Sequence, residues 1–439
     1  MINTDWEYLD SGTPEERACF AALGVYAQRH CLTEGRDALA NRLRRAPYLS
    51  AFALAEWFAW NWWRLRWEPR GHGLEWALAH HISSIGGGYI WPDITVFADG
   101  ERAALVARAT PERPETPFRY IGNVAVVMPA AELEVGIENF IGQVLDRLDS
   151  EQVPDTNLAR IWQDVQRERS DPALTTRRKL EALLGHDPNE ADTDIVDQLE
   201  ADARQWGQGA AQELAANAGH ATPSMRRPPS AHALKDMAKH FGFDRQPENV
   251  VRLAKPCTQS SRAQTPAWQQ GADAAHALRV QETLGVAPLR DSVLAAMLGT
   301  GVEALKPCHA NSVDFAFALD SLPRTSRVVL RSRWHTGRRF EMARLLGDRL
   351  TADVGNSLFL ATATDTYQQK LQRAFAAELL SPFEAVLPML EGDLSDDKLQ
   401  EVADHFQVSE LTLRTQLVNH DVLERDELDH EFLAVANYP

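Results

Sequence analysis

The chain has 439 residues, a formal net charge of −17 and four cysteines. This length suits two or three domains with ample material for a hydrophobic core. The net negative charge, with an isoelectric point near 5.3, opposes binding to nucleic-acid phosphates and so argues against a DNA-binding protein. The cysteines lack C-x-x-C spacing, which argues against a disulfide framework or a zinc knuckle and favours a reducing compartment.

Neither the amino-terminal residues nor the hydropathy pattern indicates export or membrane insertion. The first ten residues, MINTDWEYLD, are acidic and polar, unlike those of a signal peptide. The sequence contains no run of about 18 apolar residues. We therefore expect a cytoplasmic protein that does not span a membrane.

The first part of the chain predicts helices. The spacing of Phe20, Leu23 and Tyr26 predicts helical structure in residues 14–45, as two helices. Residues 52–67, FALAEWFAWNWWRLRW, predict a helix with two apolar arcs, and such a helix is usually sandwiched between layers. We expect its tryptophan arc to be covered by the helical segment after Asn157 or by another protein chain. The two arcs consist of Trp57, Trp60, Trp63 and Trp67, and of Leu54, Phe58, Trp62 and Leu65.

Short strands follow this helix. Apolar residues alternate on both sides of the turn Asp99-Gly100 (Ile94 and Val96 before it, Leu105 and Val106 after it), which predicts a β-hairpin. Residues 120–128 predict a further strand and residues 133–148 a helix, so residues 1–150 form a small mixed α/β domain. Asp93 and Glu101 suggest a restriction-type nuclease, but Ala103 stands where such a site requires lysine.

The middle of the chain is predicted to be helical. Residues 157–218 have helical periodicity, interrupted at Gly185 and at Asp187-Pro188. We assign residues 151–225 to a helical segment, residues 226–266 to a linker region, and residues 267–439 to a further domain.

That last domain is predicted to centre on two helices joined by a loop. Phe340, Ala343 and Leu346 recur at helical spacing in a helix from about Arg338, and a second helix spans residues 365–380. Together with the earlier elements, they predict an α+β fold that is predominantly helical. The remaining expected elements are strands at residues 313–319 and 327–330 and short terminal helices at residues 399–406 and 409–423.

These two helices resemble the paired-helix core of the ImmA/IrrE family of zinc metallopeptidases. Members typically read RRRFTLAHELGH on the first helix and E-x-x-A-N-x-F-A-A-E-L-L-M-P on the second. The chain retains Arg339-Phe340, Ala343, Leu346-Gly347 and the run RAFAAELLSP from Arg373 to Pro382. The resemblance implies a gluzincin-type carboxy-terminal domain behind a large amino-terminal extension. It also implies a strand before the first helix whose edge holds an extended substrate.

The chain departs from the family at the positions that carry the chemistry. An H-E-x-x-H helix binds zinc through two histidines and uses the glutamate as general base. Here those positions are Arg344, Leu345 and Asp348, and the acidic ligand expected from the second helix falls around Leu371. Arginine does not lose its proton and leucine has none to exchange, so we expect no catalytic residue, no zinc and no other cofactor. Glu378 keeps its family position.

The resemblance therefore implies a catalytically inactive protein that binds or regulates another protein. The family setting is bacterial phage defence, or a toxin–antitoxin or mobile-element system. We expect Arg339, Arg344, Asp348 and Glu378 to form the binding region. We further expect Arg344 and Asp348 to pair on one helix face, with Glu378 completing the network.

Two other functions remain open. The first is an active metal-dependent peptidase with a rebuilt site that cleaves a repressor or antitoxin, and metal content would identify it. The second is a DNA-binding regulator, which salt-dependent DNA binding would identify. The first would draw on His335, Asp348, Asp365 and Glu378, and the second on the terminal helices or on Arg331, Arg333, Arg338 and Arg339.

Overall fold

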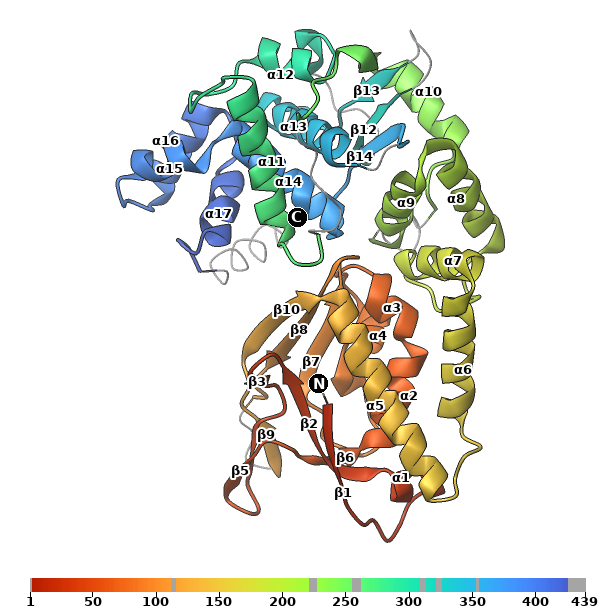
Figure 1. Ribbon diagram of the computed structural model, residues 1–439. Coiled ribbons are helices and arrows are strands. Elements are labelled where there is room, and N and C mark those ends of the chain that lie inside the picture. Colours follow the sequence, from red (N-terminus) through yellow and green to blue (C-terminus); the bar gives the residue numbers. More distant parts are fainter. Residues whose placement is uncertain are drawn as a thin grey trace. The chain divides into compact units, whose positions relative to one another are not determined.

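The computed structural model describes residues 2–111, 116–220, 227–254, 262–307, 313–320, 326–352 and 355–424. The chain forms two compact units (Figure 1). The first comprises Met1–Asp197 and Ala215–Arg227, and the second comprises Gln198–Leu214 and Pro228–Pro439. The predicted mixed composition, mainly helical with small antiparallel sheets, is confirmed.

The first unit combines three small antiparallel sheets with helices. Strands β10, β8 and β7 form one sheet in that order, β1, β2 and β3 form a second with β6 beside β2, and β5, β4 and β9 form a third. Its elements are β1 (Ile2–Trp6), α1 (Pro14–Ala18), β2 (Phe20–Ala27), β3 (His30–Cys31), β4 (Gly35–Asp37), β5 (Arg42–Arg44), β6 (Tyr48–Ser50), α2 (Ala51–Trp60), α3 (Trp62–Trp67), α4 (Leu74–His80), η1 (Ile82–Ile85), β7 (Asp93–Ala98), β8 (Arg102–Arg108), β9 (Phe118–Tyr120), β10 (Val124–Pro129), α5 (Ala130–Ser150), α6 (Asn157–Ser170) and α7 (Pro172–Leu183).

The helices predicted for residues 14–45 are wrong beyond the short α1. The structure instead places β2, β3, β4 and β5 there. Strand β2 pairs along its length with β1, with Thr4 opposite Leu23. The apolar residues of FAALGVYA fit a helical period, but this pairing with a distant strand decides their conformation.

The tryptophan-rich stretch is helical, as predicted, and divides at Asn61 into α2 and α3. Helix α6 covers one side: the rings of Trp62 and Trp162 meet edge to face 5.2 Å apart, and Trp63 Nε1 donates to Glu168 Oε2 at 2.8 Å. The internal cover expected for the tryptophan arc is therefore confirmed at Trp63, and Trp62 of the other arc also packs on α6. Trp60 differs, because 55 % of its surface is exposed. The expectation that Trp60 is buried with the others is wrong.

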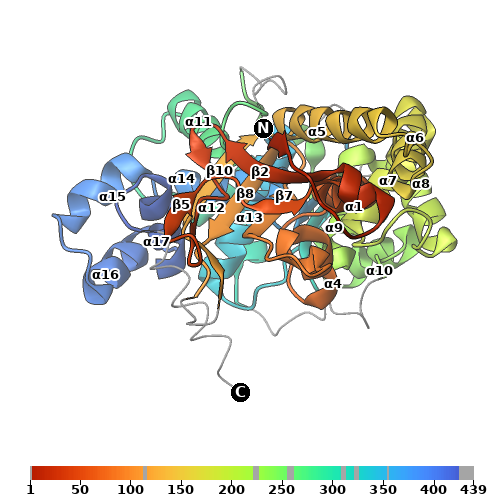
Figure 2. The same ribbon diagram turned by 90° about the horizontal axis from the view of Figure 1, so that it is seen from below.

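The predicted hairpin is confirmed as β7 and β8, with Val96 opposite Leu105. Ile94, Val96 and Leu105 are buried in the core of the unit. Helix α5 packs on β8 and β10 (Figure 1 and Figure 2). Asp93 begins β7 and Glu101 follows its far end, so the two acids lie at opposite ends of the hairpin and do not form a nuclease site.

The helical middle segment is confirmed as α6, α7, α8 (Thr193–Trp206) and α9 (Gln208–His220), with a break at Gly185. Gly185 has φ +80°, a left-handed conformation that ends the helix before Asp187-Pro188. The boundary between the two compact units falls within α8 and α9. Most of α8 and the first half of α9 therefore belong to the second unit.

The second unit is built on one antiparallel sheet in the order β11-β13-β12-β14. Helices α13 and α14 pack against each other, and α11 lies along α14 (Figure 1). Its further elements are α10 (Ala231–Phe241), β11 (Phe243–Asp244), η3 (Pro247–Asn249), α11 (Ala267–Gln281), α12 (Asp291–Met297), η5 (Val302–Leu305), β12 (Ala316–Leu319), β13 (Arg327–Val329), α13 (His335–Thr351), β14 (Leu358–Ala361), α14 (Tyr367–Leu380), α15 (Phe383–Leu390), α16 (Asp396–Phe406) and α17 (Glu410–Asn419).

Two small residues set the close approach of these helices. A Cβ on Gly347 in α13 would lie 2.7 Å from the Phe375 ring of α14. A Cβ on Gly271 in α11 would meet the backbone carbonyl of Leu371 in α14 even more closely. Only glycine permits both contacts without displacing a helix.

The strand before α13 is not an open edge. Strand β13 lies between β11 and β12, with Phe243 opposite Val328. The expectation that this edge is free for an extended substrate is therefore wrong. Its covering strand and α10 both lie in region 226–266, which the sequence analysis assigned to a linker.

The loop expected between the two central helices also contains structure that the sequence analysis missed. It forms β14, the outer strand of the sheet beside β12. Among the described residues, no helix is both long and apolar enough to cross a membrane.

Candidate functional site

The three positions that the family resemblance aligned with the metal motif, Arg344, Leu345 and Asp348, lie on the buried part of α13. Leu345 is fully buried in the apolar core of the second unit. Arg344 and Asp348, one helical turn apart, are also buried and reach toward β14 and α14. They belong to a set of polar side chains that we call the polar cluster: Arg344, Asp348, Gln368, Gln369, Gln372 and Glu213.

Arg344 uses its guanidinium to hold the end of β14. One terminal nitrogen donates to the carbonyl oxygen of Thr362 and to Oε1 of Gln369, each at 2.6 Å. Gln369 Oε1 also accepts the Thr362 backbone N–H at 2.9 Å. The charge of Arg344 thus meets neutral oxygens, and both polar backbone groups of Thr362 are satisfied by side chains.

Asp348 holds the middle of the same strand. Its Oδ2 accepts the backbone N–H of Leu360 at 2.9 Å, and its Oδ1 accepts the Gln368 side-chain amide at 2.8 Å. The carbonyl oxygen of Leu360 accepts from Gln369 and Gln372, both at 3.0 Å. The outer edge of β14 is therefore capped by side chains from α13 and α14.

The second-helix position predicted at Leu371 is wrong. Leu371 is fully buried in an apolar cluster with Ala267 and Tyr367. The family pattern places its glutamate six residues before the phenylalanine of F-A-A-E-L-L, and that count from Phe375 leads to Gln369. Gln369 is the side chain that touches Arg344, so the three positions do converge in space.

Glu213 was not predicted as a site residue, and α9 contributes it to the cluster from more than 100 residues away. Its Oε1 accepts the hydroxyl of Thr366 at 2.8 Å, and its Oε2 is buried without a hydrogen-bond partner. Its position next to this site depends on tertiary packing, and no local sequence pattern signals it.

Burial is the main cause of the pKa shifts in the polar cluster. It raises the pKa of Glu213 to about 7, and the nearby charge of Asp348 contributes in the same direction. Burial raises the pKa of Asp348 to about 6, although the N–H of Leu360 and the amide of Gln368 oppose the rise. Burial also lowers the pKa of Arg344 to about 9. The charged form of each of these three groups is disfavoured because the site is dry, that is, buried away from solvent.

The pairing expected between Arg344, Asp348 and Glu378 is wrong. The hydrogen bonds of Arg344 and Asp348 go to β14 and α14, and not to each other. Glu378 lies toward the other end of α14, where it accepts the Phe383 N–H at 3.2 Å and the Gln416 amide at 3.3 Å. Arg339 forms an ion pair with Asp291. The predicted binding residues thus occupy three separate places.

The residues considered for a rebuilt metal site also stay apart. His335 Nε2 lies 2.7 Å from Asp291 Oδ2, and Asp365 pairs with Arg373 at 2.9 Å. Within the described ranges, no group of three or more His, Cys, Asp or Glu side chains is placed to hold a metal ion. In comparisons with known proteins, no family model, curated protein or solved structure matches the chain.

Proposed function

We propose that the second unit is a non-catalytic variant of the zinc-metallopeptidase paired-helix core, and that the chain acts by binding and regulating another protein. The contacts of the polar cluster with β14 carry this proposal. The side chains at the altered metal positions, Arg344, Asp348 and Gln369, are committed to the backbone of that strand. In this proposal, the former metal position stabilises the fold.

The chemistry of these residues opposes hydrolysis. A zinc peptidase needs a metal to activate water and a base to take its proton. Arg344 places a guanidinium group at the site, and the apolar side chain of Leu345 packs in the core. Substrates of such folds add as a strand to an exposed edge. Here β11 covers β13, and side chains cap β14.

A different surface supports protein binding. Trp334, just before α13, has 64 % of its surface exposed, and the guanidinium of Arg333 lies 4.7 Å from the centre of its ring. Tryptophan and arginine are the residue types most enriched in the energetic centres of interfaces. Glu341 accepts the backbone N–H groups of Arg331 and Ser332 at 2.9 Å and 3.0 Å, so the segment before Trp334 is fixed.

We propose a bacterial regulator, toxin or defence component as the class of partner, following the family resemblance. The test is crosslinked capture from the native host with the full chain as bait, followed by mass spectrometry of the captured protein. We expect to capture a partner of full length with the wild-type chain and to lose it with Trp334→Ala. The control Val302→Ala, which changes another exposed apolar residue, should still capture the partner. Recovery of the partner as fragments whose appearance requires zinc would contradict the proposal.

A further inference from the structure

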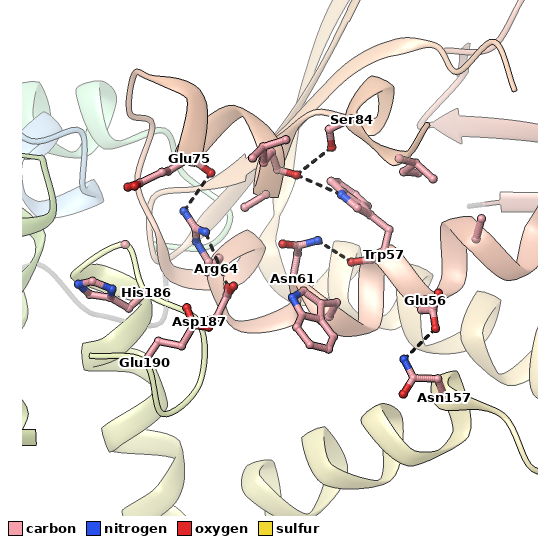
Figure 3. Close-up of a pocket in the computed structure, with 16 residues that line it drawn as sticks. Glu56, Trp57, Asn61, Arg64, Glu75, Ser84, Asn157, His186, Asp187 and Glu190 are labelled. Atoms are coloured by element: carbon pink, nitrogen blue, oxygen red, sulfur yellow. Dashed lines mark hydrogen bonds and ion pairs between the residues drawn. The ribbon is translucent and has the colours of Figure 1, made fainter. Parts of the chain in front are cut away.

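The first unit contains a cavity of about 690 Å³ that the proposed function does not use. It is bordered by α2, α3, α4, η1 and the turn after α7 (Figure 3). A volume of this size is typical of sites for small molecules. All of its lining residues belong to the first unit.

One wall of the cavity is apolar and aromatic. Trp57 is buried there, and its Nε1 donates to the carbonyl oxygen of Leu78 at 3.3 Å, so its indole ring is fixed. Trp60 and Leu78 also line the cavity, with 55 % and 54 % of their surfaces exposed. An exposed indole and an exposed leucine in the lining of one cavity offer contact to an aliphatic chain and a π face to a cation.

The only guanidinium among the lining residues does not serve as an anion receptor. Arg64 Nε donates to Glu68 Oε2 at 2.7 Å, and one terminal nitrogen donates to Glu68 Oε1 at 3.3 Å. The same nitrogen lies 3.4 Å from the carbonyl oxygen of Glu75. Glu68 therefore neutralises the charge of Arg64 from behind the cavity.

Four carboxylates also line the cavity (Glu56, Glu75, Asp187 and Glu190), together with the imidazole of His186 and the amides of Asn61 and Asn157 (Figure 3). Asp187 Oδ1 lies 3.7 Å from Arg64 and is buried without a hydrogen-bond partner. Burial raises the pKa of Asp187, the charge of Arg64 opposes this rise, and the charge of Glu190 adds to it. A cation in the cavity would provide the hydrogen-bond partner that Asp187 Oδ1 lacks and would offset the negative charge of Asp187 and Glu190.

We propose that this cavity binds an organic cation, an ammonium or guanidinium group on an aliphatic stem. The charged head lies against Asp187 and Glu190, and the stem lies along Trp60 and Leu78. The cation is either a free amine or the lysine or arginine side chain of another protein. This site does not depend on the function proposed for the second unit.

The test is isothermal titration calorimetry of the full chain with matched ligands. We expect pentylamine and agmatine to bind at one site, with affinity that falls as salt rises. Pentanol, which has the same stem without charge, and glutarate, which has the opposite charge, should not bind. A lysine peptide that binds about tenfold more tightly than pentylamine assigns the site to a protein segment, and equal affinity assigns it to a free amine.

Variants locate the binding site. Asp187→Asn, Glu190→Gln and Trp60→Ala should each weaken pentylamine binding about tenfold, as expected for the loss of a charged or cation–π contact. Glu132→Gln and Tyr8→Ala, which change exposed residues outside the cavity in the same unit, should bind like the wild type. Absence of amine binding at millimolar concentration, equal binding of pentanol, or equal weakening by the control variants would overturn the proposal.

Discussion

Replacement of Glu213 by glutamine provides a direct test of the dry polar cluster. Glutamine has the same shape and cannot ionise, so Glu213→Gln isolates the cost of charging this carboxyl. The pKa of Glu213 rises from 4.5 to about 7 on folding because of burial. The folded state therefore holds the proton more tightly than the unfolded state. The stability that this proton provides is fully present below about pH 4.5 and is lost as the pH rises through about 7.

The expected magnitude follows from the size of the rise. At about 1.4 kcal/mol per pKa unit, a rise from 4.5 to about 7 corresponds to roughly 3 kcal/mol. Between about pH 5 and about pH 8, wild type should lose most of this stability relative to Glu213→Gln. Asp348 titrates in both proteins, so its contribution largely cancels in the difference.

The assay must report on the second unit, because most of the chain's 12 tryptophans lie in the first. We would follow urea unfolding at each pH by pulsed hydrogen exchange of peptides from α13 and α14. Glu248→Gln, at an exposed residue of the same unit, controls for the loss of one negative charge. If the free energy of unfolding of wild type and of Glu213→Gln changed with pH in parallel, burial would not raise the pKa of this carboxyl. That result would refute the dry cluster.

Three further predictions concern packing and hydrogen bonding. Asp348→Ala leaves the buried N–H of Leu360 without its acceptor and should destabilise the second unit by about 1–3 kcal/mol in urea unfolding, with faster amide exchange in β14; an unchanged exchange rate would contradict the capped edge. Trp62→Ala removes a buried ring and should cost about 3–5 kcal/mol, whereas Trp60→Ala should cost less than about 1 kcal/mol; thermal unfolding that ranks them in the opposite order would contradict the packing of α2 and α3. Gly271→Ala should destabilise the contact between α11 and α14 by about 1–3 kcal/mol, more than the same change at exposed Gly301, where an added Cβ meets nothing, and equal effects in urea unfolding would refute the close approach.

Local pattern predicted the long helices well, because their apolar spacing reflects the face that they bury. The helix predicted at residues 133–148 is α5, and its apolar residues from Ile137 to Leu148 recur at helical spacing and pack in the core. The hairpin of β7 and β8 could be predicted equally well, since Asp99-Gly100 supplies the turn and apolar residues alternate along both strands.

Elements whose conformation depends on distant partners could not be predicted in this way. Residues 20–27 fit both a helical and a strand pattern, and their pairing with β1 selects the strand. Strand β14 has only four residues, and its backbone is satisfied by β12 and by side chains of α13 and α14. Short apolar runs of this kind carry too little periodicity to be assigned from sequence.

The site was predicted in part. The resemblance aligned Arg344, Leu345 and Asp348 with the metal motif of the peptidase family, and these residues do lie on a helix, as predicted. Gln369 was missed through a register error of two residues on α14. Glu213 could not be found, because only the packing of α9 brings it beside Thr366.

The most direct test of the central claim is the zinc content of a chain whose metal motif has been restored. The restored variant carries Arg344→His, Leu345→Glu, Asp348→His and Gln369→Glu, and the control carries the first three changes and keeps Gln369. Both are expressed with zinc, checked for folding by circular dichroism and measured by elemental analysis. We predict about one zinc per chain in the restored variant, and far less in the control and in wild type. Stoichiometric zinc in wild type, or a folded restored variant with no more zinc than the control, would contradict the claim.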